Sequence, residues 1–576
     1  MNPALAAGLQ TALVIAVLAI LYVPVGDYMA KVYTTDSDLR SGDLRVESTL
    51  YRLCRIDPRV EQTWYGYAGS LLGFSAAGVL FLYFLQRIQG VLPLSGGLSG
   101  VSPAVAFNTA ASFVANTNWQ SYAPETTMSN LTQPLGLAVQ NFVSAAVGMA
   151  VAVALIRGFV RVSRGGEIGN FWVDLTRGSL RILLPISFVI ALILLSQGVI
   201  QSFHTGFGST GLDGNAATNA LAPVASQEAI KELGTNGGGI LAANSAHPFE
   251  NPTPLTNVVE IIAILLIPVA LTRTFGTMVG DPHDRASEVS GHRQGLTLLS
   301  VMGLLWGGLL AVTLAAESGH RGVAATAAGG MMEGKEVRFG IPGSALFAVS
   351  TTGTSTGAVN SAHDSMSPLG GGAVLLNMLL GEIAPGGVGT GLYSILIFAL
   401  IAVFVGGLLV GRTPEYLGKK LGKREITLAA LSVLVMPALV LIGTGITVIL
   451  SSTTGFQGNS GDPGTPGSIH GFSEVLYAFA SASNNNGSAF GGLTVTSDWF
   501  QSSLGVCMLL GRFLPIIFVL ALAGALASQR KTAPTAGTLP TAGPMFAGLL
   551  TGTVVLVAAL TFFPALALGP IAEALQ

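Results

Sequence analysis

The chain has 576 residues, of which half are apolar and only 10% are charged. Soluble domains usually carry about 25% charged residues, so this composition favours a chain embedded in lipid. The formal net charge of −2 suggests neither a basic nucleic-acid surface nor an acidic tail. Two cysteines, Cys54 and Cys507, are too few for a disulfide framework or a cysteine metal cage.

Ten apolar runs are long enough to cross a bilayer, which takes roughly 20 residues each. They cover residues 5–29, 63–86, 134–157, 178–200, 254–275, 295–316, 369–411, 425–450, 499–527 and 543–570. The first run follows Met1 without a basic segment or a small-residue cleavage site, so we expect a retained helix. The sequence therefore predicts an all-α integral membrane protein with ten transmembrane helices.

The distribution of lysine and arginine predicts how these helices are oriented. With the N-terminus placed outside, 21 of the 27 Lys and Arg residues fall in segments on the inner side and five in outer segments. Positive charges are enriched in cytoplasmic loops, so this partition predicts a multi-pass protein with both termini outside.

Four outer segments share one pattern, a short apolar stretch followed by a polar tripeptide rich in Gly and Asn. The third residues of the tripeptides are separated by 119, 120 and 130 positions. Ordinary turns between hydrophobic helices are the alternative interpretation, and the near-equal spacing of four copies argues against it. The tripeptides are Asn116, Thr117 and Asn118; Thr235, Asn236 and Gly237; Ser355, Thr356 and Gly357; and Asn485, Asn486 and Gly487.

The apolar stretches before the tripeptides are too short to span the membrane, which suits re-entrant pore helices. Non-helical backbone at membrane depth must line protein or water, so the tripeptides are expected to face a central pore. Rings of backbone carbonyls replace the water shell of an alkali cation, and Gly permits the required backbone angles. The tripeptides contain no Asp, Glu, His or Cys, which favours a monovalent ion over a divalent or transition metal.

This repeat predicts the organisation of the chain. An extra transmembrane helix at 1–30 precedes four units of span, pore helix, loop and span, and another extra helix follows at 543–572. The four units are expected at 62–160, 172–285, 292–424 and 425–530, the third with a broken second helix.

The run 369–411 would be about 63 Å long as one helix, roughly twice the hydrocarbon thickness. Pro385 and five glycines interrupt it within GEIAPGGVGTG at 381–391, which predicts a break. We expect a hinge or gate under the third tripeptide, formed by Glu382, Gly386, Gly387 and Gly389. A tilted helix with a loose end is the alternative.

Arg512 lies inside the ninth run, where an unpaired cation is costly and usually faces the bundle interior. We expect it under the tripeptides, as an electrostatic barrier to leak of the ion. The alternative is an ion pair with a carboxylate such as Glu382, and the two roles can coexist. Glu260, in the fifth run, is interpreted as a marker of the outer membrane interface.

Other charged residues carry weaker signals. Glu228, Lys231 and Glu232 lie on the second pore helix and are interpreted as solvated charges, although they could attract cations. The seven histidines show no metal-ligand spacing, and His363 is expected to be a hydrogen-bonded loop residue. No GxxxxGK[ST] loop or DKTG phosphorylation motif occurs, so energy for transport must come from a partner or an ion gradient.

The strings NTNWQ (116–120), GTNGGG (234–239), STGAVNSAHDS (355–365) and NNNGSAFGGL (484–493) resemble the selectivity-filter segments of the K⁺-binding subunit family of Kdp-type K⁺-transporting ATPases. The resemblance covers nearly the whole chain. It implies that all twelve tripeptide residues bind K⁺, mainly through main-chain oxygens, flanked by Gln120, Gly234, Gly238 and Asn484. The first tripeptide lacks the Gly that ends the others, so imperfect symmetry around the ion is expected.

The same resemblance implies a non-catalytic, K⁺-translocating subunit in the bacterial plasma (inner) membrane, with no nucleotide on this chain. Its expected partners are an ATP-hydrolysing P-type B subunit, which would receive K⁺ sideways, the small C and F subunits of the Kdp complex, and membrane lipid, but no nucleic acid. A K⁺ channel or symporter of the same architecture is the first rival. An intramembrane enzyme is the second, and the sequence shows no nucleophile and base or metal constellation for it.

Overall fold

The computed structural model describes residues 3–34, 42–204, 206–281, 283–319, 329–450, 467–533, 535 and 537–575. Within these residues, ten helices are long and apolar enough to cross a membrane, which confirms the predicted number of spans. They are Ala4–Tyr33, Trp64–Val91, Gln133–Val160, Phe171–Ser196, Pro254–Val279, Arg285–Glu317, Thr390–Leu409, Lys423–Ile449, Asp498–Ala527 and Pro544–Leu575.

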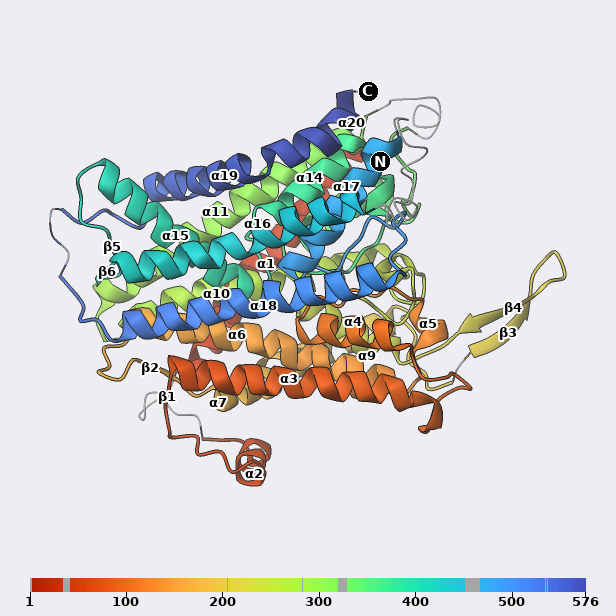
Figure 1. Cartoon of the computed structure of the whole chain (residues 1–576), viewed down its shortest axis with the longest axis horizontal. Helices are drawn as coiled ribbons and strands as arrows, with labels where there is room; N and C mark the ends of the chain where they lie inside the picture. Colours follow the sequence, from red (N-terminus) through yellow and green to blue (C-terminus); the bar gives the residue numbers. More distant parts are fainter. Residues whose placement is uncertain are drawn as a thin grey trace.

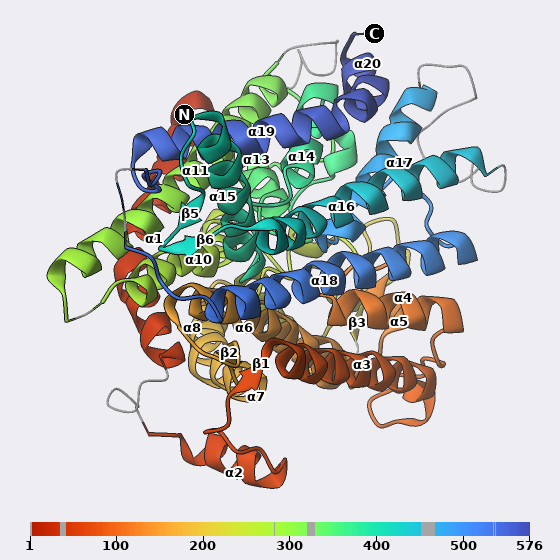
Figure 2. The same ribbon diagram turned by 60° about the vertical axis from the view of Figure 1, so that its left-hand side comes forward.

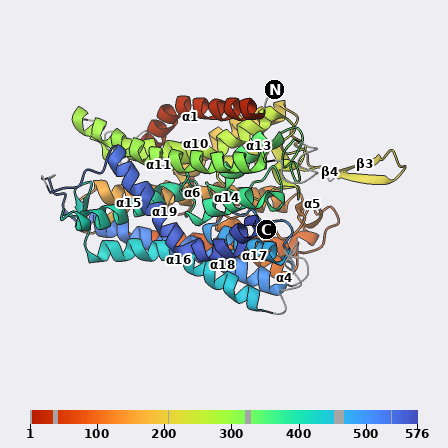
Figure 3. The ribbon, with the colours of Figure 1, turned by 90° about the horizontal axis from the view of Figure 1, so that it is seen from above.

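The long helices run side by side along the longest axis of the molecule (Figure 1). Both termini lie at one end, from which the β3–β4 hairpin (Gly206–Thr210 and Ala216–Ala220) projects, as Figure 3 also shows. The N- and C-terminal helices α1 (Pro3–Tyr33) and α19 (Pro544–Leu566) are therefore compatible with termini on the same side of a membrane. Arg40 and Arg321, two of the arginines behind the predicted orientation, lie outside the described residues.

Between α1 and α19 the described residues build four units, each with a short helix between two spans. Figure 2 labels three of these short helices, α4, α13 and α17. The first has α3 (Trp64–Ile88), α4 (Pro103–Val114) and α6 (Val139–Val160). The second has α7 (Phe171–Arg177), the π-helical turn η3 (Gly178–Leu183), α8 (Leu184–Ser196), α9 (Val224–Leu233) and α10 (Pro254–Val279). The third has α11 (Arg285–Glu317), α13 (Gly340–Thr352), α14 (Pro368–Leu379) and α15 (Thr390–Leu409), and the fourth has α16 (Lys423–Ile449), α17 (Gly467–Asn484) and α18 (Asp498–Ala527).

Shorter elements occupy the connections. The helical ones are α2 (Arg45–Leu53), η1 (Gln89–Val91), α5 (Pro124–Thr127), η2 (Gln133–Ala138), η4 (Asn244–Ala246), η5 (His363–Ser365), η8 (Ala567–Ile571) and α20 (Ala572–Leu575). Strands β1 (Gln62–Thr63) and β2 (Glu167–Gly169) pair antiparallel, as do β3 with β4 and β5 (Glu415–Tyr416) with β6 (Lys419–Lys420). The all-α prediction thus describes the membrane body, and the three small sheets found in the described part of the chain lie in its connections.

The core lies around the second spans of the first two units. In the 18-residue apolar windows of the spans that contain α6 and α10, 89% and 78% of residues are buried, against 11% for α1 and 17% for α16. All four helices are similarly apolar, but for different reasons. The apolar side chains of α6 and α10 pack against protein, whereas those of α1 and α16 are available to contact lipid. The inner position of α6 brings its polar residues Asn141 and Ser144 against the first two tripeptides.

The predicted break in the seventh run is confirmed. Helix α14 ends at Leu379 and α15 begins at Thr390. Gly381, Gly386 and Gly389 have φ angles of +89°, +85° and +85°, which an α-helix excludes.

A histidine joins three segments at the end of the molecule that holds both termini. His470 of α17 lies 2.9 Å from Asp364 Oδ1 through Nε2 and 2.9 Å from Glu573 Oε1 through Nδ1. Hydrogen bonds to Asp364 and Glu573 raise the pKa of His470 to about 10. The protonated ring therefore ties the C-terminal helix α20 to α17 and η5.

Candidate functional site

The four polar tripeptides meet at one point, although they are more than a hundred residues apart in sequence. A β-carbon on Gly237 would lie 2.5 Å from Cα of Gly357, and one on Gly357 would lie 2.8 Å from Cα of Gly487. A β-carbon on Gly487 would overlap the carbonyl oxygen of Thr117. Glycine is therefore required at these three positions by the close approach of neighbouring loops.

Each tripeptide has the same local backbone geometry. Its first residue is left-handed, with φ of +65° at Asn116, +45° at Thr235, +52° at Ser355 and +59° at Asn485. The N–H of the second residue donates to the carbonyl five positions earlier, in the pairs Thr117–Ser112 (2.9 Å), Asn236–Lys231 (2.9 Å), Thr356–Thr351 (3.2 Å) and Asn486–Ser481 (2.9 Å). A trans peptide points its C=O opposite to its N–H, so each first-residue carbonyl is directed away from its own pore helix.

The short helices end directly before the tripeptides. Helices α4, α9, α13 and α17 end at Val114, Leu233, Thr352 and Asn484. The C-terminal end of a helix carries a partial negative charge of about half an elementary charge, which favours a cation. Four such ends converge on the tripeptides, so the region attracts positive charge without any formal anion in the loops.

Hydrogen bonds between the loops hold the arrangement together. The Gly357 N–H donates to the Asn236 carbonyl (2.6 Å), and Asn485 Nδ2 donates to Thr117 Oγ1 (3.0 Å). The side-chain amides of Asn116 and Asn236 are in contact at 2.6 Å, and Asn116 Nδ2 also donates to the Thr235 carbonyl (2.9 Å). The first loop contributes side chains where the others contribute glycine, which gives the imperfect symmetry that its sequence indicates.

The four predicted flanking residues lie next to the tripeptides. Gln120 exchanges two hydrogen bonds with the backbone of Gly239, at 2.9 and 3.1 Å. Gly238 is left-handed, with φ of +66°. The Gly234 N–H donates to the Ile230 carbonyl (2.7 Å), and Asn484 Nδ2 donates to the Ala480 carbonyl (2.9 Å).

The segment between α14 and α15 contacts three of the four loops. Val388 N–H donates to Thr235 Oγ1 (2.8 Å), and a β-carbon on Gly387 would lie 2.9 Å from Cβ of Ser355. Glu382 Oε1 accepts a hydrogen bond from Asn486 Nδ2 (2.8 Å). The predicted hinge therefore packs against the tripeptides, while its gating role stays a prediction.

Arg512 lies close to the same region and is buried, with 2% of its surface exposed. Its guanidinium donates to Thr390 Oγ1 (2.9 Å) and to the Ser144 carbonyl (3.1 Å). One turn earlier in α18, the Met508 carbonyl accepts from Asn485 Nδ2 (2.9 Å). Among the described residues, Arg512 forms no ion pair, so the alternative pairing with Glu382 is wrong.

The prediction that Glu228, Lys231 and Glu232 are solvated is wrong. Their side chains are 2%, 0% and 0% exposed, and Lys231 Nζ lies 2.7 Å from Glu228 Oε2. Helix α9 packs against α8 and α10, and the loop after the second tripeptide places Asn244 and Glu250 on Lys231, so these charges pair internally. Glu250 also pairs with Lys231, and burial raises the pKa of the Glu250 carboxyl to about 7.

The interpretation of Glu260 as an interface marker is wrong as well. Glu260 is fully buried, and its carboxylate lies within 4.8 Å of those of Glu228 and Glu232. His363, in contrast, is the hydrogen-bonded residue that was expected, with Nδ1 2.9 Å from the Tyr477 hydroxyl. Burial, with a smaller contribution from Lys335, lowers the pKa of His363 to about 4.

Some residues that support the site were not singled out from the sequence. Asn141 of α6 accepts from Asn118 Nδ2 (2.8 Å), and Ser144 Oγ donates to Asn116 Oδ1 (2.6 Å). Thr351 Oγ1 donates to the Ala358 carbonyl (2.6 Å). The available signal was a polar residue within an apolar run, or a hydroxyl at a fixed distance before three of the four tripeptides.

The fold and the four-loop site define a multi-pass transport protein built from four span, pore-helix, span units around a pore. A sequence model of the potassium-transporting ATPase A subunit, KdpA, matches residues 12–575. The chain belongs to this family.

Relatives support the same assignment. The potassium-transporting ATPase potassium-binding subunits of Rhodococcus jostii (strain RHA1) and Rhodococcus erythropolis (strain PR4 / NBRC 100887) are 89% and 87% identical over 576 residues, and 100% of each chain is covered. Among solved structures, the potassium transporter TrkH from Vibrio parahaemolyticus has a TM-score of 0.51 at 14% identity, covering 88% of this chain and 97% of that chain. That likeness concerns the fold.

Proposed function

We propose that this chain is the K⁺-binding and K⁺-translocating subunit of a Kdp-type ATPase, and that the twelve tripeptide residues are its selectivity filter. The convergence of four uncharged loops, in each of which the N–H of the second residue donates back to the pore helix, carries this proposal. Carbonyl and amide oxygens can replace the hydration shell of K⁺ at this point.

The filter loops carry no formal charge, which favours a monovalent cation over a divalent one. Divalent cations such as Ca²⁺ and Mg²⁺ select carboxylate ligands, whereas weakly charged oxygens suit a monovalent ion that must also leave. The helix ends supply partial negative charge without binding the ion too tightly for release. K⁺ is therefore the transported ion in this proposal, and it enters from the outer side.

Energy would come from another polypeptide. The chain carries neither a nucleotide-binding P-loop nor a DKTG motif, which supports a non-catalytic role without bound nucleotide. The names of the relatives describe a potassium-binding subunit of an ATPase. We assign ATP hydrolysis to a P-type B subunit, with the C and F subunits completing a complex in the bacterial plasma (inner) membrane and both termini of this chain outside.

A cavity beneath the third and fourth loops supports a sideways path to the ATP-hydrolysing partner. The cavity has a volume of about 80 Å³, and its lining includes Ser355, Asn485 and residues of α15, α16 and α18. Helix α16 is among the least buried spans, so it is available for contact with another polypeptide of the complex. An ion leaving the filter on this side would pass between helices instead of straight through the pore.

Rubidium uptake into proteoliposomes tests the proposed function. The whole complex should accumulate Rb⁺ only with ATP, and the chain purified without its partners should give little passive flux. Robust passive flux through the isolated chain, with no co-purifying polypeptide that carries DKTG, would instead support a channel or symporter.

A further inference from the structure

The second unit departs from the other three at one position of its pore helix. The residue five positions before the second filter residue is Ser112, Thr351 or Ser481 in the first, third and fourth units, and Lys231 in the second. The hydroxyls brace their own loops. Ser112 Oγ donates to the Trp119 carbonyl (3.0 Å), Thr351 Oγ1 donates to the Ala358 carbonyl (2.6 Å), and Ser481 Oγ accepts from the Gly487 N–H (2.9 Å).

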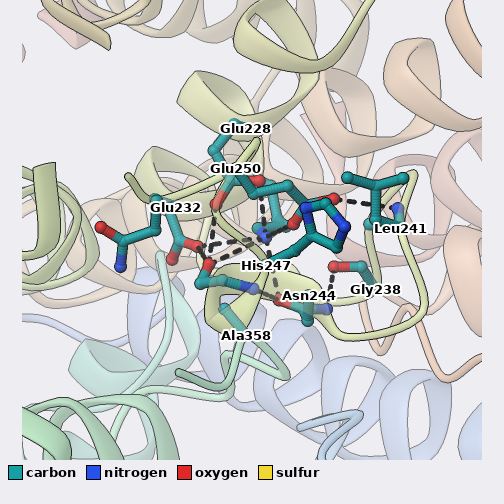
Figure 4. A network of polar contacts seen from close by, with 12 residues as sticks. Glu228, Glu232, Gly238, Leu241, Asn244, His247, Glu250 and Ala358 are labelled. Atoms are coloured by element: carbon teal, nitrogen blue, oxygen red, sulfur yellow. Dashed lines mark hydrogen bonds and ion pairs between the residues drawn. The ribbon is translucent and has the colours of Figure 1, made fainter. Parts of the chain in front are cut away.

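Lys231 is fully buried, and its side chain contacts a cluster of buried polar groups. Figure 4 shows Glu228, Glu232, Asn244 and Glu250 of this cluster. Its ammonium lies 2.7 Å from Glu228 Oε2, 3.3 Å from Glu250 Oε2 and 3.4 Å from Glu232 Oε1. It also donates to Asn244 Oδ1 (2.9 Å) and Ser245 Oγ (3.2 Å). A buried ammonium is stable only with such partners, so its position is determined by the surrounding carboxylates.

Asn244 connects this ammonium to the filter. Its Nδ2 donates to the carbonyl of Gly238, the residue that follows the second tripeptide. Its Oδ1, which receives the Lys231 ammonium, also accepts from the N–H of Val359, two residues after the third tripeptide (3.4 Å). One side chain therefore links Lys231 to the outer flanks of two neighbouring filter loops.

Glu250 provides a parallel connection. Its Oε2 faces Lys231, and its Oε1 accepts from the Leu241 N–H (2.9 Å). A β-carbon on Gly239 would lie 3.1 Å from Glu250 Oε1, so the carboxylate packs against that backbone. Gly239 in turn exchanges two hydrogen bonds with Gln120, which flanks the first loop.

We propose that Lys231 is a positioning residue for K⁺ selection. Through Asn244 and Glu250, its buried ammonium fixes the outer flank of the second loop relative to the first and third loops. This inference rests on the proposed function, because it assumes that the loops select K⁺. The hydroxyls of Ser112, Thr351 and Ser481 bond their own loops directly. Lys231 instead acts on the second loop indirectly, through Asn244 and Glu250.

The variant Asn244→Gly isolates this connection. Asn244 has a φ angle of +55°, which glycine adopts without strain, so the change removes the amide and leaves all charges in place. In the purified complex with its co-purifying subunits, K⁺-stimulated and Rb⁺-stimulated ATP hydrolysis gives KM and kcat for each ion. We expect the KM for K⁺ to rise about tenfold and the preference for K⁺ over Rb⁺ to fall several-fold, with kcat nearly unchanged, because only the geometry of ground-state binding is altered.

Lys231→Met should have the same signature, and Lys335→Met is its matched control. Lys335 is also a buried lysine, with Nζ 2.7 Å from Glu317 Oε2, and it makes no described contact with the filter residues. Both lysine variants leave a carboxylate unpaired, so both should lower the thermal stability of the complex. Only Lys231→Met should change the ratio of KM for K⁺ and Rb⁺.

The outcomes separate this inference from the proposed function. If the unmodified complex shows no K⁺-stimulated hydrolysis, the proposed function is wrong. If the unmodified complex is active and Asn244→Gly keeps both KM values and their ratio, the positioning role of Lys231 is wrong, whether or not Lys231→Met assembles. An equal change of ion preference in Lys335→Met would also overturn it.

Discussion

Arg512→Gln tests whether a single buried cation prevents K⁺ from crossing the pore directly. The guanidinium is held by Thr390 at the start of α15 and by the Ser144 carbonyl of α6, with no described carboxylate to neutralise it. The Asn485 side chain bonds the Met508 carbonyl, one helical turn before Arg512. One turn of helix is about 5.4 Å, so we expect a separation of roughly 8 Å between the Arg512 charge and an ion held by the fourth loop.

The size of the barrier follows from Coulomb's law. Two unit charges about 8 Å apart repel by about 2 kcal/mol at an effective dielectric constant near 20. A barrier of about 2 kcal/mol slows passage by roughly thirtyfold. Glutamine keeps a polar, though shorter, side chain and removes the charge, so passive K⁺ leak should rise by about that factor.

Proteoliposomes containing the complex, without ATP, provide the assay. Passive Tl⁺ or Rb⁺ flux should increase about thirtyfold in Arg512→Gln, and ATP-driven uptake should fall relative to ATP hydrolysed. Arg512→Lys keeps the charge but loses the planar guanidinium that donates to both Thr390 and Ser144. Because the charge remains, the K⁺ leak of this variant should stay near that of the unmodified complex. Unchanged leak and unchanged coupling in Arg512→Gln would refute the barrier role.

Three further changes test the filter, the break between α14 and α15, and the contacts of His470 with Asp364 and Glu573. Gly487→Ala should abolish K⁺-stimulated ATP hydrolysis, because its β-carbon meets the neighbouring loop at a φ of +105°, whereas Gly491→Ala, with open space around it, should be nearly neutral. Gly386→Ala, at φ +85°, should lower the maximum rate of uptake measured with Rb⁺, and an unchanged rate would count against a gate in this segment. The pKa of His470 is raised to about 10, so the stability that its protonated ring provides is complete below about pH 6.5 and is lost as pH rises through about 10. His470→Gln should remove that part of the pH dependence of Tm. Parallel curves of Tm against pH for the variant and the unmodified protein would contradict this prediction.

Much of the architecture could be predicted because each signal lies within a single segment. An apolar run reports its own length, and the glycines and Pro385 between 381 and 391 are sufficient to break a helix. The four tripeptides could be recognised because the same sequence pattern, a short apolar stretch followed by a polar tripeptide, recurs at nearly constant spacing. Their left-handed first residues could not be predicted in this way, since Thr235 is β-branched and such a residue adopts a positive φ only where the surrounding structure imposes it.

Charged side chains were harder to interpret, because their surroundings come from distant segments. Lys231 looks like a solvated residue on a short helix, yet Glu250 and Asn244 of the following loop enclose it. Glu260 lies near the start of its span, where a carboxylate would ordinarily reach water, but α9 covers it. Arg512 seemed able to pair with Glu382, which instead bonds Asn486.

By itself, the sequence determined the ten membrane spans, the fourfold repeat, the broken helix and the neutral character of the loops, since hydropathy and backbone preference act over neighbouring residues. Only the tertiary structure decided which polar groups are buried together and which charge has no opposite partner among the described residues. The physical reason is that the free energy of a charge depends on everything within several ångströms of it, and in this protein those neighbours come from helices far apart along the chain.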